Sequence, residues 1–226
     1  MIILAADTSN STCCAGVYRD GDELAFELSL EKRTHSETFM PLVERVVEKS
    51  GITYGDIDAI AVTVGPGSFT GIRIGLSAVK GMAYAVPCPL IPVSSTKALA
   101  GSSEVAEGDP SETLFVPSFD ARNNRVFASV VKASDLTAVV EEGAFDAEDL
   151  AERIKELKGR RKVIVLGNGA DTIRNAAQGR FEAEYAPGAV ILPRGIYNAS
   201  RGTDPVGAEA CSASYCAVSS AERLRK

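Results

Sequence analysis

Residues 65–75 carry the most informative stretch of this chain, Gly65-Pro66-Gly67-Ser68-Phe69-Thr70-Gly71-Ile72-Arg73-Ile74-Gly75. An apolar run at 59–64 precedes it, and a helical pattern follows it to about Ala85. A buried strand, a glycine-rich turn and a helix in this order form many phosphate-binding loops, because the first N–H groups of a helix are free and partly positive. The stretch is therefore either a phosphate-binding loop or a tight turn with another purpose.

The spacing of the glycines matches neither common nucleotide motif. The dinucleotide fingerprint G-x-G-x-x-G would need its third glycine one residue before Gly71, and no acidic residue stands about twenty positions further on, at 89–93. The Walker motif needs a Lys after its last glycine, and none is present. The alternative is a tight turn in which Pro66 fixes φ and the glycines supply positive φ.

Composition limits the class of protein. The chain has 226 residues and a net charge of −6, and its five cysteines contain no C-x-x-C pair. We therefore expect one large or two small domains, a location in a reducing compartment, and no direct binding of nucleic acid by this chain alone. The first residues lack the pattern of a signal peptide, and no apolar run reaches the ~18 residues of a membrane span. These features predict a soluble cytoplasmic protein with no membrane contact.

His35 is the sole histidine, which excludes a two-histidine metal site.

The chain repeats one pattern. In the first half, a strand ends at Asp7, a second strand returns, and a helix, a strand, a glycine turn and a helix follow. In the second half, a strand ends at Asp120, and the same order leads to the glycine turn at 167–170. Because internal repetition reports architecture, we predict two similar α/β domains, 1–105 and 106–226, each a mixed sheet with flanking helices.

Two helices of the first half present unusual faces. The helix expected at 36–50 has a wide apolar face, and the one at 70–86 has small residues at every fourth position. One interpretation is packing within the chain, and the other is contact with helices of another chain. On the second interpretation, the partner-binding residues are Phe39, Met40, Val43, Val47, Gly71, Gly75 and Gly81.

Four stretches together resemble a known family: AADTS at the N-terminus, GPGSFTGIRIGLSAVKGMAYA from Gly65, DARNNRVFASV from Asp120, and GNGA from Gly167. They are similar to the TsaB (YeaZ) family, whose members have two ribonuclease H-like domains of the actin, hexokinase and Hsp70 ATPase superfamily. The resemblance spans most of residues 1–170.

The resemblance implies a role in making threonylcarbamoyladenosine next to the anticodon of tRNAs that read ANN codons. It implies a subunit without catalytic residues, which binds and activates a catalytic paralogue, TsaD, and works with a P-loop ATPase, TsaE. Contact with tRNA would come only through the complex, and the chain would form a homodimer when alone. In the TsaD family two histidines four residues apart bind a metal. At the corresponding positions this chain has Ser95 and Leu99, so we expect neither a metal site nor catalysis.

The superfamily also implies positions that face a nucleotide, namely Asp7, Thr8, Asp120, Gly167 and Gly169. We expect no required cofactor at these positions. Weak binding of ADP or ATP with magnesium, and with it an ATPase-like function of Asp7 and Asp120, is the alternative that stays open.

Overall fold

The computed structural model describes residues 1–30 and 35–216, and the chain divides into two compact units. Met1–Ser103 and Val190–Ser214 form the first unit, and Glu104–Ala189 with Tyr215 and Cys216 form the second. We predicted domains at 1–105 and 106–226. The difference lies in Val190–Ser214, which returns to the first unit because its apolar residues pack there.

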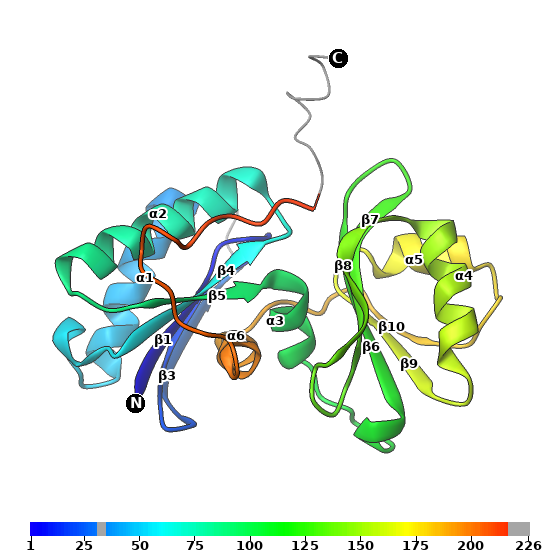
Figure 1. Ribbon diagram of the computed structural model, residues 1–226, viewed down its shortest axis with the longest axis horizontal. Coiled ribbons are helices and arrows are strands. Elements are labelled where there is room, and N and C mark those ends of the chain that lie inside the picture. The colour runs from blue at the N-terminus through cyan, green and yellow to red at the C-terminus, as the bar shows by residue number, and fades with distance from the viewer. Residues whose placement is uncertain (31–34, 217–226) are drawn as a thin grey trace, which may run out of the picture. The chain divides into compact units, whose positions relative to one another are not determined.

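The first unit is a five-stranded mixed sheet with helices on both faces (Figure 1). Its strands are β1 (Ile2–Asp7), β2 (Cys13–Arg19), β3 (Asp22–Ser29), β4 (Ala59–Gly65) and β5 (Leu90–Ser94). Its helices are α1 (His35–Lys49), α2 (Phe69–Ala85), α3 (Ser95–Gly101) and α6 (Pro193–Ser200). The strand order is β3-β2-β1-β4-β5, with β2 antiparallel to β1 and β4 parallel to it.

Alternate residues of β2 point to opposite faces of this sheet, as the period of a strand requires. Ala15 and Val17 belong to a core that includes the buried residues of α1 and α2. Gly16, between them, lies against Pro193 at the start of α6. Helices α1 and α2 therefore cover one face, and α6 packs on the other.

The second unit repeats the plan of the first. Its strands are β6 (Thr113–Asp120), β7 (Arg125–Lys132), β8 (Ala138–Asp146), β9 (Lys162–Leu166) and β10 (Glu184–Ala186). Its helices are α4 (Ala147–Lys158) and α5 (Ala170–Ala177). Read from its other edge, the sheet has the order β8-β7-β6-β9-β10, which matches β3-β2-β1-β4-β5 strand for strand. The predicted fold class, two α/β domains that are each a mixed sheet with flanking helices, is confirmed.

Residues 203–214 form an extended segment that completes the first unit, drawn in orange-red in Figure 1. Leu90 and Val206 exchange two backbone hydrogen bonds of 2.9 and 2.7 Å, so the segment covers the edge of β5. Cys211 is buried in the core, and the N–H of Ser214 donates to the carbonyl of Val64 at 2.7 Å. Without this segment, β5 would be an open sheet edge.

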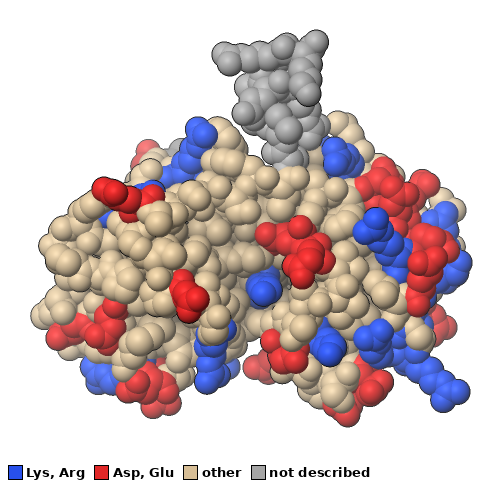
Figure 2. Space-filling view, viewed as in Figure 1, with Lys and Arg blue, Asp and Glu red and all other residues tan. Residues whose placement is uncertain are grey.

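Charged side chains are unevenly distributed on the face shown in Figure 2. They are sparse over the first unit and crowded over the second. No helix in the described ranges is both long enough and apolar enough to cross a membrane.

Candidate functional site

The turn after β1 holds a buried carboxylate, Asp7, whose side chain is 1% exposed. Its Oδ1 atom accepts hydrogen bonds from the N–H and the hydroxyl of Ser9, at 2.9 and 2.5 Å, and from the hydroxyl of Thr63 on β4, at 2.5 Å. Its Oδ2 atom is buried and has no hydrogen-bond partner within residues 1–30 and 35–216. Asp7 therefore ties the turn to β4 through one oxygen.

Burial raises the pKa of the Asp7 carboxyl above its usual value, although the hydrogen bonds from Ser9 and Thr63 oppose this shift. A buried carboxyl whose pKa is raised favours its neutral form, because desolvation penalises the charge.

The glycine turn at 65–71 packs against the chain itself. The N–H of Ser68 donates to the carbonyl of Ser9 at 2.7 Å, and the Ser68 hydroxyl caps α2 by accepting from the N–H of Gly71 at 3.1 Å. A Cβ atom added at Gly67 would lie closer than 3.0 Å to the carbonyl oxygen of Ser9. The space that a phosphate group would need beside these residues is filled by the β1–β2 turn.

A nucleotide with magnesium does not fit the residues of the first unit. The Asp7 side chain is enclosed, and the N–H groups of Ser68 and Gly71 are already hydrogen bonded within the chain. Within the described ranges, no group of three or more His, Cys, Asp and Glu side chains could hold a metal ion. The turn at 65–71 is a packing element, as the failed motif spacing indicates.

Changing Asp7 to Asn tests whether the buried carboxyl titrates as described. The pKa of Asp7 is higher in the folded chain than in the unfolded chain, so the unfolded chain ionises first as the pH rises above about 3.9. The free energy of unfolding of the wild type therefore falls over that interval, whereas Asp7→Asn lacks this component. We expect the variant to gain stability relative to the wild type between pH 3.5 and 7, as measured by urea unfolding. A stability difference that is constant with pH would contradict this assignment.

The second unit places the three remaining nucleotide candidates together at the ends of β6 and β9. The N–H of Asp120 donates to Oδ1 of Asn168 at 3.0 Å, and the N–H of Gly169 donates to the carbonyl of Ser118 at 3.2 Å. Gly167 has a φ of +86°, which favours glycine. The Asp120 carboxylate is exposed and accepts from the N–H of Arg122 at 2.9 Å, so it closes its own turn. Asp120, Gly167 and Gly169 thus belong to a different unit from Asp7 and Thr8.

The positions that correspond to the metal-binding histidines of the TsaD family are buried in α3. Ser95 donates a hydrogen bond from its hydroxyl to that of Ser9 at 3.0 Å, and Leu99 is part of the core. His35, at the start of α1, has its Nε2 atom 2.7 Å from the carbonyl oxygen of Asn10. None of these three side chains is arranged for metal or acid–base chemistry with another.

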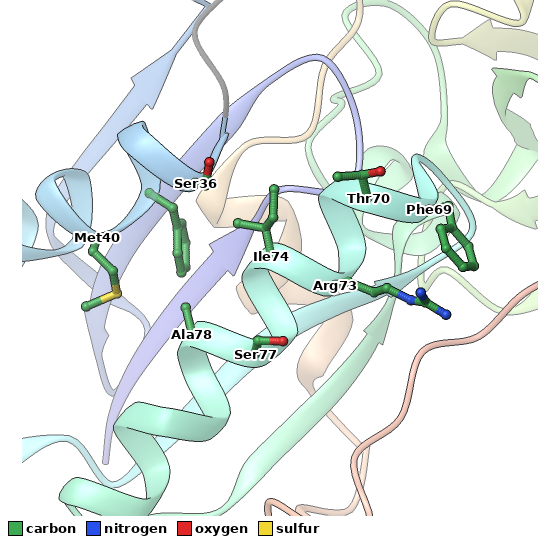
Figure 3. A pocket seen from close by; sticks show the side chains of 9 residues that line it. Ser36, Met40, Phe69, Thr70, Arg73, Ile74, Ser77 and Ala78 are labelled. Carbon is green, nitrogen blue, oxygen red and sulfur yellow. The ribbon is translucent and has the colours of Figure 1, made fainter.

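A groove of about 540 Å³ lies between α1 and α2 on the surface of the first unit (Figure 3). Its floor and walls are mostly apolar or small, and among the described residues that line it Arg73 is the one with a charge. The lining residues are Ser36, Phe39, Met40, Phe69, Thr70, Arg73, Ile74, Ser77 and Ala78. In Figure 3, Ile74 and Ala78 extend from the side of α2 nearer to Met40, whereas Arg73 extends along the ring of Phe69. The distance from the guanidinium carbon of Arg73 to the centre of that ring is 3.6 Å.

The structure corrects part of the predicted partner-binding set. Phe39, Val43 and Val47 are at most 5% exposed and belong to the core beneath α1. Gly71 and Gly75 face Thr8 of the same chain, because added Cβ atoms would lie closer than 3.0 Å to its carbonyl and hydroxyl oxygens, respectively.

These two glycines therefore accommodate Thr8, whose hydroxyl donates to the carbonyl of Gly71 at 2.8 Å, and they do not form an open strip. Met40 lines the groove, and Gly81 is exposed with nothing within 4 Å of an added Cβ atom. Of the predicted set, Met40 and Gly81 are thus the residues with a free side, and Phe39 reaches the floor of the groove.

Sequence reasoning missed the α2 side of the groove, from Phe69 to Ala78. The signal was available, because the buried positions Ile72, Leu76, Val79 and Ala83 define one face of α2. The opposite face then contains Ile74, Ser77 and Ala78, which line the groove. Beside the buried face, Phe69 and Tyr84 are large residues that are 43% and 62% exposed.

The chain matches the family model described as TsaD, tRNA N6-adenosine threonylcarbamoyltransferase, over residues 29–193. It also resembles curated proteins named tRNA threonylcarbamoyladenosine biosynthesis protein TsaB. It is 33% identical to that of Bacillus subtilis over 74% of this chain and 71% of the relative. It is 31% identical to that of Escherichia coli over 75% of this chain and 72% of the relative. The match to the protein of Haemophilus influenzae, at 34% identity, spans 58% of this chain and 54% of that relative's length.

A solved structure titled YeaZ, from Pseudomonas aeruginosa, has the same fold. The TM-score is 0.82 at 23% sequence identity, and the alignment covers 95% of this chain and 99% of that one. The family model, the three relatives and the duplicated sheet agree. The chain belongs to the TsaB (YeaZ) family of tRNA threonylcarbamoyladenosine biosynthesis proteins, within the wider group that the TsaD model describes.

Proposed function

We propose that this chain is a non-catalytic subunit in the formation of threonylcarbamoyladenosine next to the anticodon of tRNAs that read ANN codons. In this role it binds and activates a catalytic TsaD-like paralogue. A TsaE-like P-loop ATPase completes the complex, and tRNA contacts this chain only through the assembly. The protein needs no cofactor of its own for this function.

The observation that carries the proposal is the open, mostly apolar groove between α1 and α2. A surface helix normally turns its apolar side inward, yet here Phe69, Tyr84 and Met40 leave apolar surface at solvent on the same pair of helices. Grooves of this kind receive amphipathic helices of partner proteins. The match to the TsaD model supports a paralogue as the partner, since a protein of the same plan would carry a comparable helix pair.

Two further observations support a role without catalysis. Ser95 and Leu99 occupy the positions that carry metal-binding histidines in the TsaD family, and both are buried. Asp7 is enclosed and hydrogen bonded within its own turn, so the ATPase-like alternative gains no support from the first unit.

The groove can be tested with Met40→Glu and a matched control, Leu30→Glu. A carboxylate at Met40 would be desolvated without a partner when a helix fills the groove, which opposes binding. We expect Met40→Glu to weaken the affinity for the TsaD-like paralogue of the same organism by about thirtyfold or more, by isothermal titration calorimetry. Leu30 is 67% exposed and does not line the groove, so the same added charge there should leave the affinity unchanged.

Thermal unfolding of each variant shows whether the fold is intact. Ser77→Tyr provides a second variant, because Ser77 is exposed and its larger replacement would fill the groove without burying a charge. Wild-type affinity in both groove variants would contradict the proposal. Light scattering on the protein alone tests the further expectation that it self-associates through the same face when the paralogue is absent.

A further inference from the structure

The junction of α4 and β9 in the second unit holds four basic residues in five positions, Lys158-Gly159-Arg160-Arg161-Lys162, which we call the basic turn. Gly159 has a φ of +54°, which favours glycine and lets the chain turn sharply at the end of α4. Figure 2 shows Lys and Arg side chains gathered at the lower right, the region of the C-terminus of α4 in Figure 1. Positive charge is therefore concentrated at this turn, although the net charge of the chain is −6.

Two of the four cations make contacts that shape the basic turn. Arg161 donates from its guanidinium to the carbonyl oxygens of Leu157 and Lys158, with 3.3 Å between Nε and the second of these. This contact caps the C-terminus of α4. The ammonium of Lys162 pairs with the carboxylate of Glu184 at 2.7 Å. Arg161 and Lys162 thus hold the backbone of the turn in place.

The other two cations, Lys158 and Arg160, are available to a ligand. Arg160 is exposed and Lys158 is partly exposed, and within the described ranges neither side chain forms a hydrogen bond or an ion pair. The C-terminus of a helix favours a cation, which accounts for Lys158, but Arg160 lies beyond the end of α4. Like charges repel one another, so this cluster destabilises the fold unless an anion binds beside it.

The surface of the second unit favours a polyanion over an apolar partner. Between Glu104 and Ala189 no large apolar or aromatic side chain is exposed. Protein–protein interfaces have an apolar centre, and proteins that bind single-stranded nucleic acid stack its bases on aromatic rings. The basic turn has neither feature. Its chemistry fits the phosphate backbone of a nucleic acid duplex, which Lys and Arg bind without reading the bases.

We propose that Lys158 and Arg160 bind the phosphate backbone of a double-helical stem of the tRNA within the assembled complex. The inference rests on the proposed function, which brings tRNA to this chain, and it adds a direct contact made by the second unit. Two cations on a chain of net charge −6 bind weakly by themselves, so the contact forms only where the complex already holds the tRNA.

The test measures the affinity of the complex for tRNA. The complex contains this chain, the TsaD-like paralogue and the TsaE-like ATPase, and the probe is an unmodified, labelled transcript of a tRNA that reads ANN codons. Each phosphate that a cation neutralises releases counterions, so its loss lowers the slope of log affinity against log salt concentration by about 1. By fluorescence anisotropy, we expect Lys158→Ala/Arg160→Ala to weaken binding about tenfold at about 50 mM NaCl and to lower the slope by about 1 to 2.

Arg153→Ala/Arg174→Ala is the matched control, because it removes the same charge from the same unit. The guanidinium carbons of Arg153 and Arg174 lie over the rings of Phe145 and Tyr185, 5.6 and 4.6 Å from the ring centres. We expect this control to bind tRNA as the wild type does. The variant of the basic turn should be at least as stable as the wild type in urea unfolding, because it relieves repulsion between cations. Its weaker binding would then not reflect a damaged fold.

The outcomes distinguish this inference from the proposed function. If the variant of the basic turn matches the wild type in affinity and slope, or if the control loses as much affinity, the inference is overturned and the proposed function stands. If the variant weakens binding to the paralogue in the absence of tRNA, the turn contacts a protein and the inference is overturned. If the wild-type chain does not bind the paralogue, both proposals fail.

Discussion

Gly75→Leu is expected to lower the free energy of unfolding by about 3 kcal/mol, which is the upper range for overpacking a close contact. The Cβ atom alone would lie closer than 3.0 Å to the hydroxyl oxygen of Thr8. Thr8 has little room to move, because it is buried and its hydroxyl donates to the carbonyl of Gly71 at 2.8 Å. Chemical denaturation of the isolated protein measures the effect.

A double-mutant cycle shows whether Thr8 is the cause. Gly75→Ala and Thr8→Ala should each destabilise the protein, the first by steric conflict and the second by loss of the hydrogen bond to Gly71. The two together should cost less than their sum, because removal of the Thr8 hydroxyl makes room for the new methyl group. Additive costs, or a Gly75→Leu variant as stable as the wild type, would show that the contact between Thr8 and α2 does not hold α2 in place.

Gly81→Leu, six residues further along the same helix, is expected to have the opposite effect on stability. Nothing lies within 4 Å of an added Cβ atom at Gly81, and a leucine in a helix interior is favoured over glycine by roughly 0.8 kcal/mol. The isolated variant should therefore unfold at higher denaturant concentration than the wild type. Its affinity for the TsaD-like paralogue should fall by about a hundredfold, because a large side chain would hold a partner helix away from α2.

Because Gly81→Leu should raise stability while it lowers affinity, a loss of affinity in this variant cannot come from a folding defect. A folding defect would lower stability and affinity together, whereas a blocked interface lowers affinity alone. Gly51→Ala serves as the matched glycine control, because Gly51 has positive φ, has nothing within 4 Å of an added Cβ atom and does not line the groove. It should reduce stability and leave affinity intact. Wild-type affinity in Gly81→Leu would mean that the partner does not reach the C-terminal half of α2.

The duplicated fold could be predicted because the pattern that reveals it is local. A strand that ends in an aspartate, at Asp7 and at Asp120, and a glycine turn before a helix are each visible within a few residues. The sequence does not reveal strand β8, because Glu141, Glu142 and Gly143 interrupt its alternation of apolar and polar residues. The strand is stabilised by its pairing with β7, and not by the strand propensity of its own residues.

The exposed face of α1 and α2, to which we assign partner binding, could not be read fully from the sequence. Periodicity shows that one side of a helix is covered, but it does not show which chain covers it. Small residues at every fourth position look the same whether they admit Thr8 of the same chain, as at Gly71 and Gly75, or leave an open surface, as at Gly81. The packing of Val190–Ser214 on the first unit could not be predicted either. The contact between Leu90 and Val206 joins residues far apart in the sequence, and no local pattern indicates it.

The interleaved order of the two units has a consequence for biosynthesis. The residues Glu104–Ala189 of the second unit are translated as one continuous stretch. In the first unit, the edge of β5 is covered only after Val206 has been translated. At roughly 5–20 residues per second, the delay between Leu90 and Val206 is on the order of ten seconds. The second sheet can therefore finish folding before the first, although most of the first is translated earlier. During that interval the edge of β5 stays uncovered in the nascent chain.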